Sequence, residues 1–471
     1  MTTTLTLDDL PRADHLARRF VIGGAWNLLG SAAPQALTLG AQIAISRMLG
    51  KAVFGQIGVV YTTLITLGTF AGLGLGVTAV KHVAEFHLAD RPRAARVILL
   101  TSLITWIVSG LVTLAVAITA PWMARVVFRE SALMLPLRLG SPLILLTALG
   151  TLQLGVLSGF EAFRAVAALK VAVGFCTAPI LLAGARLQGM TGVLVAYVAL
   201  AALTLGCTQW LITRQSKNWR FRAPWSGLAA EIPLLWRYSA SAFLSSLLWP
   251  ITVWLTNLFV VRLPDGYQKV GQLNAVRQLQ QAVNVIPVAL NGAVMPILAS
   301  VLANTPRDKD RSLRFTNYLT FVAVLPVTLV LMLGAPWIMK LYGPAYSKGW
   351  PILVVMIGAT AVSLLNSAAG TLILAKGAMA ANLINSVLTS LFLVAVLALT
   401  IGRWELQSVS VGTLICNLLS TIGVVVYSIM RLGFPRSVGN AIIYSSIALS
   451  GITAILPMLL MWALMWAPAG R

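Results

Sequence analysis

Long polar side chains recur at helical spacing inside two apolar stretches of this sequence. One set is Asn274, Arg277, Gln281, Asn284 and Asn291, and the other is Asn27, Ser31, Gln35, Thr38 and Gln42. Steps of three and four residues place each set on one face of a helix. A guanidinium and several amides facing one space could bind a polar, anionic ligand. We therefore expect Arg277, Gln281 and Asn284 to lie across a cavity from Gln35 and Gln42.

A second interpretation of the same pattern is structural. Asn, Gln, Ser and Thr side chains also form hydrogen bonds between neighbouring membrane helices. Amides that faced lipid would be costly, so both interpretations turn these faces toward the interior of a helical bundle. The length of the two stripes favours a wet cavity.

Other cations and two prolines stand near the same segments. Arg47, Lys81 and Arg262 lie at segment ends, where they either contribute to the mouths of the cavity or extend toward the membrane surface. Pro34 and Pro250 lie inside apolar segments, and a proline there removes one backbone hydrogen bond and kinks the helix. These kinks either bend during gating or are static.

Several functional classes are disfavoured by what the sequence contains. The three cysteines, Cys176, Cys207 and Cys416, have neither CxxC nor histidine spacing, so we expect no metal site and no cofactor. The net charge of +22 arises from basic residues that flank apolar segments and meet lipid headgroups, so we expect no nucleic-acid partner. Carboxylates are almost missing from the segment interiors, which disfavours coupling to protons or sodium.

Composition determines the fold class. The chain of 471 residues is 58% hydrophobic and 10% charged, whereas a soluble domain carries about 25% charged residues. Apolar runs long enough to cross a bilayer recur along it. We expect an all-α polytopic membrane protein with spans near 20–46, 53–80, 97–120, 139–160, 165–185, 190–212, 237–261, 278–302, 315–339, 351–375, 381–401, 408–430 and 440–467.

The two halves of the sequence resemble each other. Val53-Phe54-Gly55-Gln56 has a counterpart in Val270-Gly271-Gln272, and the offset that relates Gln56 to Gln272 also relates Pro34 to Pro250. A slightly larger offset relates 191–193 to 411–413. Internal duplication with a substrate site between the halves is typical of secondary transporters.

These features predict the domain organisation. A cytoplasmic segment (1–19) precedes a first lobe of six spans (20–213), a basic and aromatic linker on the cytoplasmic surface (214–236), a second lobe of six spans (237–430) and one further span (440–467). The excess of Lys and Arg on one side places the N-terminus in the cytoplasm.

Five short motifs resemble those of the bacterial polysaccharide and O-antigen flippases, a family in the superfamily of multidrug extruders and the lipid II flippase. They are ISRMLG at 45–50 followed by FG at 54–55, GLG at 74–76 followed by Lys81, LSGFEAFR at 157–164, YGPAY at 342–346, and Asn366 with LAKG at 374–377. The motifs occur in the family's order and extend over roughly residues 18–430.

The resemblance implies two six-helix lobes around a central cavity that opens alternately inward and outward. The implied substrate is an oligosaccharide on undecaprenyl pyrophosphate, moved to the periplasmic leaflet of the bacterial inner membrane for O-antigen, exopolysaccharide or capsule synthesis. Arg277, Gln281, Asn284, Gln35 and Gln42 would then bind the diphosphate, with Arg47, Lys81 and Arg262 nearer the mouths. Membrane lipids and a polysaccharide polymerase are the implied partners.

Three alternatives stay open. A multidrug extruder on the same fold would normally carry an acidic residue in its first-lobe cavity, and none is apparent. A lipid II flippase has fourteen spans, whereas one extra span is visible here. A membrane glycosyltransferase or ligase would need catalytic carboxylates or large periplasmic loops, and the predicted loops are mostly short.

Overall fold

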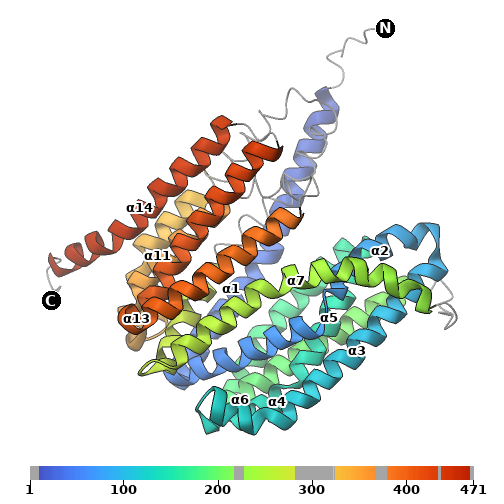
Figure 1. Ribbon diagram of the computed structural model, residues 1–471, viewed down its shortest axis with the longest axis horizontal. Helices are drawn as coiled ribbons and strands as arrows, with labels where there is room; N and C mark the ends of the chain where they lie inside the picture. Colours follow the sequence, from blue (N-terminus) through green and yellow to red (C-terminus); the bar gives the residue numbers. More distant parts are fainter. Residues whose placement is uncertain are drawn as a thin grey trace.

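The computed structural model describes residues 10–216, 228–281, 322, 324–365, 379–432 and 436–466, and in these residues it is helical without strands. Figure 1 shows two groups of helices that meet at one end and diverge toward the other. The long helices are α1 (Leu10–Ala71), α2 (Leu75–Ala89), α3 (Arg91–Trp122), α5 (Pro142–Gly159), α6 (Phe163–Ser216), α7 (Leu228–Val261), α11 (Trp350–Leu365), α13 (Met379–Leu432) and α14 (Arg436–Trp466). Shorter elements are the π-helical turn Met123–Val127, the helices α4 (Met134–Gly140) and α10 (Ala335–Leu341) and the 3₁₀ turns Ser131–Leu133 and Pro344–Gly349.

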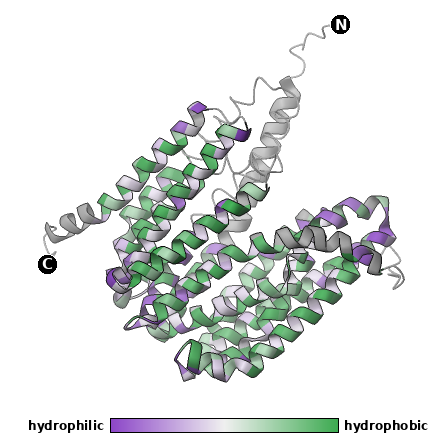
Figure 2. Cartoon of the chain, viewed as in Figure 1, coloured by the Kyte–Doolittle hydropathy of each residue, from purple (hydrophilic) through white to green (hydrophobic). Residues whose placement is uncertain are grey.

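The helices are apolar on most of their surface, as a lipid environment requires (Figure 2). Among the described residues, seven helices are long and apolar enough to cross a membrane, or eight if the pair Val324–Leu333 and Ala335–Leu341, bent by 69°, counts as one. The predicted class of polytopic α-helical membrane protein is therefore confirmed.

Three of the seven long stretches contain a break near the middle, so each accounts for two predicted spans. The breaks lie at Gly50 in α1, at Gln188 and Gly189 in α6, and at Glu405 in α13. In α6 the backbones of Gly184 and Gly192 lie in close contact on either side of the break. This contact shows that the chain reverses there and forms a helical hairpin. In α13 Asn385 Nδ2 donates to Ser420 Oγ over 2.7 Å, which identifies a second helical hairpin.

The predicted span 315–339 contains the 69° bend between Val324–Leu333 and Ala335–Leu341, and the predicted span 53–80 is interrupted as well. The stretch 53–80 is interrupted at Leu73 and Gly74, which have φ values of 47° and 68°, and α2 begins at Leu75. Glycine adopts this left-handed conformation at little cost, and Gly72, Gly74 and Gly76 follow one another at alternate positions. The interruption therefore has a local cause that hydropathy does not detect.

The predicted internal repeat appears in the backbone conformation. Gly189 (φ 59°, ψ −129°) and Glu405 (φ 47°, ψ −123°) share one unusual conformation, and they are as far apart along the chain as Gln56 and Gln272. Packing repeats as well, since α1 and α5 pack on α6 in the first half while α7 and α11 pack on α13 in the second. The helix 440–467 expected at the end is the single helix α14, with Pro457 inside it.

Several predicted segments lie wholly or partly outside the described residues. They include residues 1–9, most of the predicted eighth span after Gln281, and part of the linker 214–236. Helix α7 begins at Leu228, inside that expected linker.

Candidate functional site

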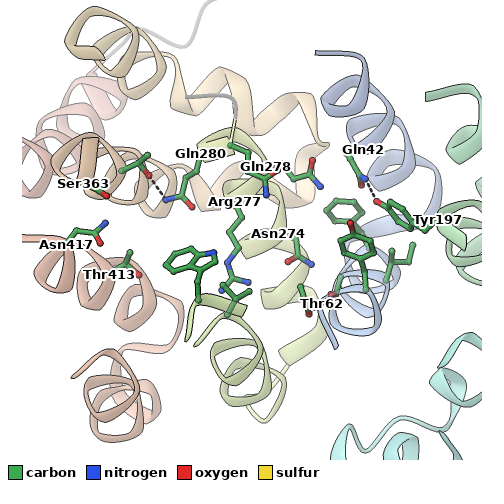
Figure 3. Close-up of a pocket in the computed structure, with 18 residues that line it drawn as sticks. Gln42, Thr62, Tyr197, Asn274, Arg277, Gln278, Gln280, Ser363, Thr413 and Asn417 are labelled. Atoms are coloured by element: carbon green, nitrogen blue, oxygen red, sulfur yellow. Dashed lines mark hydrogen bonds between the residues drawn. The ribbon is translucent and has the colours of Figure 1, made fainter. Parts of the chain in front are cut away.

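A cavity of about 420 Å³ lies between the two halves of the molecule. Figure 3 shows Arg277 on helix 266–281, with Gln42 and Tyr197 of the first half on one side and Ser363, Thr413 and Asn417 of the second half on the other. Its described lining is rich in amides, hydroxyls and aromatic rings: Gln42, Phe54, Ile57, Gly58, Tyr61, Thr62, Tyr197, Trp249, Val253, Asn274, Arg277, Gln278, Gln280, Gln281, Thr360, Ser363, Thr413 and Asn417.

Arg277 is the one charged side chain among these lining residues, and a chain of hydrogen bonds positions it. Its Nη1 donates to Asn257 Oδ1 over 2.6 Å, and Asn257 Nδ2 donates to Thr62 Oγ1 over 3.0 Å. Asn257 is only 1% exposed, so its amide cannot turn to solvent instead. This bond orients the guanidinium. Among the described residues its other N–H groups have no hydrogen-bond partner, so they can bind an anion.

The second half contributes a wall of anchored polar groups. Gln280 Nε2 donates to Met356 O over 2.8 Å and to Thr360 Oγ1 over 2.9 Å. Asn417 Nδ2 donates to Ala359 O over 2.8 Å. These bonds hold both side chains against α11. They use the amide nitrogens, so the amide oxygens of Gln280 and Asn417 are not engaged in these contacts. The wall therefore suits a ligand with hydroxyl or phosphate groups.

The first half contributes an aromatic wall. The rings of Tyr61 in α1 and Tyr197 in α6 lie with centroids 4.4 Å apart and planes inclined by 34°. Gln42 Nε2 donates to the hydroxyl of Tyr197. Both tyrosines are partly exposed to the cavity, and Phe54 lines it beside them.

At one end of the cavity the two halves of the chain touch each other, and we call this group of contacts the inter-half contact. It joins one set of residues in the first half to another set in the second half: Ser46, Arg47, Lys51 and Gly55 with Tyr267, Gly271, Gln272 and 341–346. Lys51 Nζ donates to Gln272 Oε1 over 2.6 Å and to Ala345 O over 3.2 Å. Arg47 Nε donates to Leu341 O over 2.6 Å, and Ser46 Oγ to Tyr342 O over 3.2 Å.

The predicted site residues fall into three groups. Arg277, Gln281 and Gln42 line the cavity together, although Gln42 belongs to the opposite half of the sequence. Gln35 is partly buried in α1, exposed Lys81 lies in α2 and exposed Arg262 follows α7, and none of these three is among the described lining residues. Asn284 lies outside the described residues.

Arg47 and the two prolines have other surroundings. Arg47 lines a separate pocket beside Lys51 and Tyr346, within the inter-half contact. Pro34 packs against Gly174 of α6, and the carbonyl of Pro250 accepts a hydrogen bond of 3.3 Å from Thr66 Oγ1. Neither proline lies at a break in its helix.

Sequence reasoning missed Asn257, Tyr61 and Tyr197. Asn257 is an amide inside an apolar span, and its position one residue after Thr256 was a usable signal. The tyrosines gave no such signal, because an aromatic residue in an apolar helix is ordinarily a packing residue.

A family model described as "Polysaccharide biosynthesis protein" matches residues 20–302, more than half of the chain. A search of curated protein sequences gave no match.

Solved structures of several transporters share the fold. The lipid II flippase MurJ in an inward closed conformation aligns with a TM-score of 0.70 at 12% identity, covering 94% of this chain and 96% of that one. A multidrug resistance transporter of the MATE family and MOP superfamily, in an inward-facing conformation, aligns with a TM-score of 0.69 at 15% identity, covering 85% and 94%. A MOP superfamily transporter from Pyrococcus furiosus aligns with a TM-score of 0.60 at 15% identity, covering 86% and 95%. At these identities the likeness shows a shared fold, that of MOP superfamily transporters.

Proposed function

The chain belongs to the polysaccharide biosynthesis protein family, and we propose that it is a flippase for undecaprenyl-pyrophosphate-linked oligosaccharides. It moves the repeat unit from the cytoplasmic to the periplasmic leaflet of the bacterial inner membrane. The product serves O-antigen, exopolysaccharide or capsule synthesis, where a polysaccharide polymerase uses it.

The observation that carries this proposal is the position of Arg277 between the two halves. A diphosphate that leaves the headgroup region loses its hydration, and this loss is prohibitive unless charge and hydrogen-bond donors replace the water. Arg277 supplies the charge, and Gln281 and Gln42 supply amide donors in the same cavity. A cavity of about 420 Å³ is in the range of small-ligand sites, so it accommodates the diphosphate with the adjoining sugar rather than the whole lipid.

Alternating access follows from the arrangement of the halves. The inter-half contact closes one end, and the two groups of helices diverge from it (Figure 1). With the N-terminus in the cytoplasm, the closed end is periplasmic and the cavity receives substrate from the cytoplasmic leaflet. Exit requires the inter-half contact to open, and bending near Pro34 and Pro250 would accompany that change.

The membrane potential supports movement in this direction. An inside-negative potential favours outward movement of negative charge by about 2.3 kcal/mol per charge per 100 mV.

Arg277 would bind the diphosphate, while Lys81 and Arg262 would act at the mouths of the cavity.

Reconstitution tests the proposal. Purified protein in proteoliposomes should move a fluorescent undecaprenyl-pyrophosphate-linked oligosaccharide between leaflets, measured as the fraction that a membrane-impermeant quencher reaches. Arg277→Ala should reduce the rate at least about tenfold, because the charge-assisted bond contributes about 1.5–3 kcal/mol. Arg186→Ala is the matched control, because Arg186 is exposed on α6 and does not line the cavity.

Arg277→Lys separates two ways of binding. It retains more activity if charge alone matters and less if two parallel hydrogen bonds to the phosphate matter. An Arg277→Ala protein that moves the substrate at the wild-type rate contradicts the proposed site. Extrusion of cationic drugs without movement of the lipid-linked sugar would favour a multidrug extruder instead.

A further inference from the structure

The two walls of the cavity differ in chemistry at positions that the internal repeat makes equivalent. The offset that relates Gln56 to Gln272 also relates Tyr61 to Arg277, and the offset that relates 191–193 to 411–413 also relates Tyr197 to Asn417. Tyr61, Arg277, Tyr197 and Asn417 all line the same cavity. If the repeated residues were unchanged, the two walls of the cavity would be alike. Instead, one wall carries two tyrosines and the other carries an arginine and an asparagine, so the two walls differ in chemistry.

The aromatic wall packs against the hydrophobic core and also lines the cavity. The two rings pack on each other with centroids 4.4 Å apart and planes inclined by 34°, and both residues are partly exposed and line the cavity. Gln42 donates a hydrogen bond from its amide to the hydroxyl of Tyr197 and lines the cavity together with the two tyrosines. An inorganic or purely anionic ligand gains nothing from such a wall, because its charge is poorly solvated against aromatic rings.

A sugar ring matches this surface. One face of a pyranose consists of C–H groups that pack on aromatic rings, while the hydroxyl groups at its edge bind amides and phenols. The sugar that adjoins the diphosphate is also the part of the carrier lipid that must enter the cavity with it.

We infer that Tyr61 and Tyr197 form the sugar subsite of the cavity, which receives the pyranose attached to the diphosphate while Arg277 holds the diphosphate. The inference rests on the proposed function and adds to it a physical basis for recognising the sugar. Gln42 contributes by fixing the hydroxyl of Tyr197, which keeps that ring in place beside Tyr61.

Equilibrium binding to the purified full chain tests the inference with two probes. One is farnesyl diphosphate, and the other is farnesyl diphosphate that carries one glucose. The wild-type protein should bind the glucose-bearing probe about fivefold more tightly, since an aromatic contact contributes about 1 kcal/mol. Tyr61→Leu and Tyr197→Leu should bring this ratio of dissociation constants toward one, and Tyr61→Phe should lower it less because the ring remains.

Two further variants separate this subsite from the diphosphate site. Arg277→Ala should weaken the binding of both probes. Tyr444→Leu is the matched control, because Tyr444 is 69% exposed on α14 outside the cavity, and the ratio should stay at its wild-type value.

Each other outcome has a definite meaning. If the tyrosine-to-leucine variants weaken both probes equally, the pair is a packing contact and the inference is overturned. If the wild-type protein binds both probes with one affinity, the sugar is not recognised here, although the proposed function stands. A wild-type protein that binds neither probe overturns the proposed diphosphate site together with the inference.

Discussion

Gly55 and Gly271 lie in backbone contact across the interface of the two halves, and each is pressed against a carbonyl group of the other half. A Cβ atom added to Gly55 would lie 1.8 Å from Tyr267 O, and one added to Gly271 would lie 2.2 Å from Lys51 O. A single offset along the sequence relates both Gly55 to Gly271 and Lys51 to Tyr267, so the contact is reciprocal. Small residues allow this approach of two helices within a membrane. The repeat therefore places a two-fold contact at the end of the cavity that is closed.

Alanine at either glycine should push the halves apart at this end. We expect Gly55→Ala or Gly271→Ala to shift the protein away from the closed contact, because the added atom meets backbone that cannot rotate aside. Spin labels at positions 129 and 348, with the three native cysteines replaced, would measure the separation by electron paramagnetic resonance. Gly206→Ala is the control, because a Cβ atom there meets no atom within 4 Å. Unchanged label distances in the Gly55→Ala and Gly271→Ala proteins would contradict the tight contact.

Lys51 should stabilise the same closed end. Lys51→Met removes the bonds from its Nζ to Gln272 Oε1 and Ala345 O. Because the side chain is partly solvated, we expect a loss of about 1 kcal/mol, which is roughly a fivefold shift in the population of the closed end. The labels at positions 129 and 348 would report a larger fraction of long distances. Lys340→Met, at an exposed position on α10, should leave the distribution as it was. A Lys51→Met protein with the wild-type distribution would show that the contact contributes nothing.

Glu405 holds a conformation that its repeat counterpart Gly189 adopts without strain. A non-glycine residue at φ 47°, ψ −123° costs about 1–3 kcal/mol, whereas its ion pair with Lys269 at 2.8 Å is half exposed and contributes less than about 1 kcal/mol. We therefore expect Glu405→Gly to raise the midpoint of thermal unfolding by about 2 °C, measured in detergent. Gly189→Ala introduces the strain at φ 59° and should lower the midpoint. A lower midpoint for Glu405→Gly would mean that the ion pair outweighs the strain.

Asn257 should act on the substrate through Arg277. Asn257→Asp places a carboxylate where the amide oxygen now accepts from Arg277, so the guanidinium would be held by a charge that competes with the diphosphate. We expect the KM for the lipid-linked substrate to rise about tenfold, with a smaller rise for Asn257→Ala. The transport assay measures KM, and thermal unfolding checks that both variants are folded. Asn385→Ala, at a position in α13 that is not among the lining residues of the cavity, serves as the control. Equal KM values for the Asp and Ala variants would exclude competition by charge.

The membrane orientation can be measured at two exposed positions. Asp265 lies in the turn after α7, and Arg214 lies near the end of α6. With the N-terminus in the cytoplasm, a membrane-impermeant maleimide should label Asp265→Cys in intact cells and Arg214→Cys only after permeabilisation. Labelling of position 265 from the cytoplasmic side alone would invert the proposed direction of transport.

The membrane-protein class and the internal repeat follow from patterns within the sequence. Hydropathy depends on composition within one segment, so it predicted membrane helices correctly. The three- and four-residue spacing of Arg277 and Gln281, and the stripe that contains Gln42, are also properties of single helices. In the structure these three residues line one cavity, whereas Gln35 on the same stripe is not among its described lining residues.

Which segments meet depends on packing between helices, and the folded structure shows it. The pairing of Tyr61 with Tyr197 and the contact of Gly55 with Gly271 join helices that are distant along the chain, and the bond from Arg277 to Asn257 joins two helices across a turn. In a membrane helix nearly every face is apolar, so periodicity does not distinguish an aromatic ring in a cavity wall from one in the core. The meeting of helices depends on close packing of small residues and on polar groups finding partners. Those conditions involve two segments at once, and no pattern within either segment contains them.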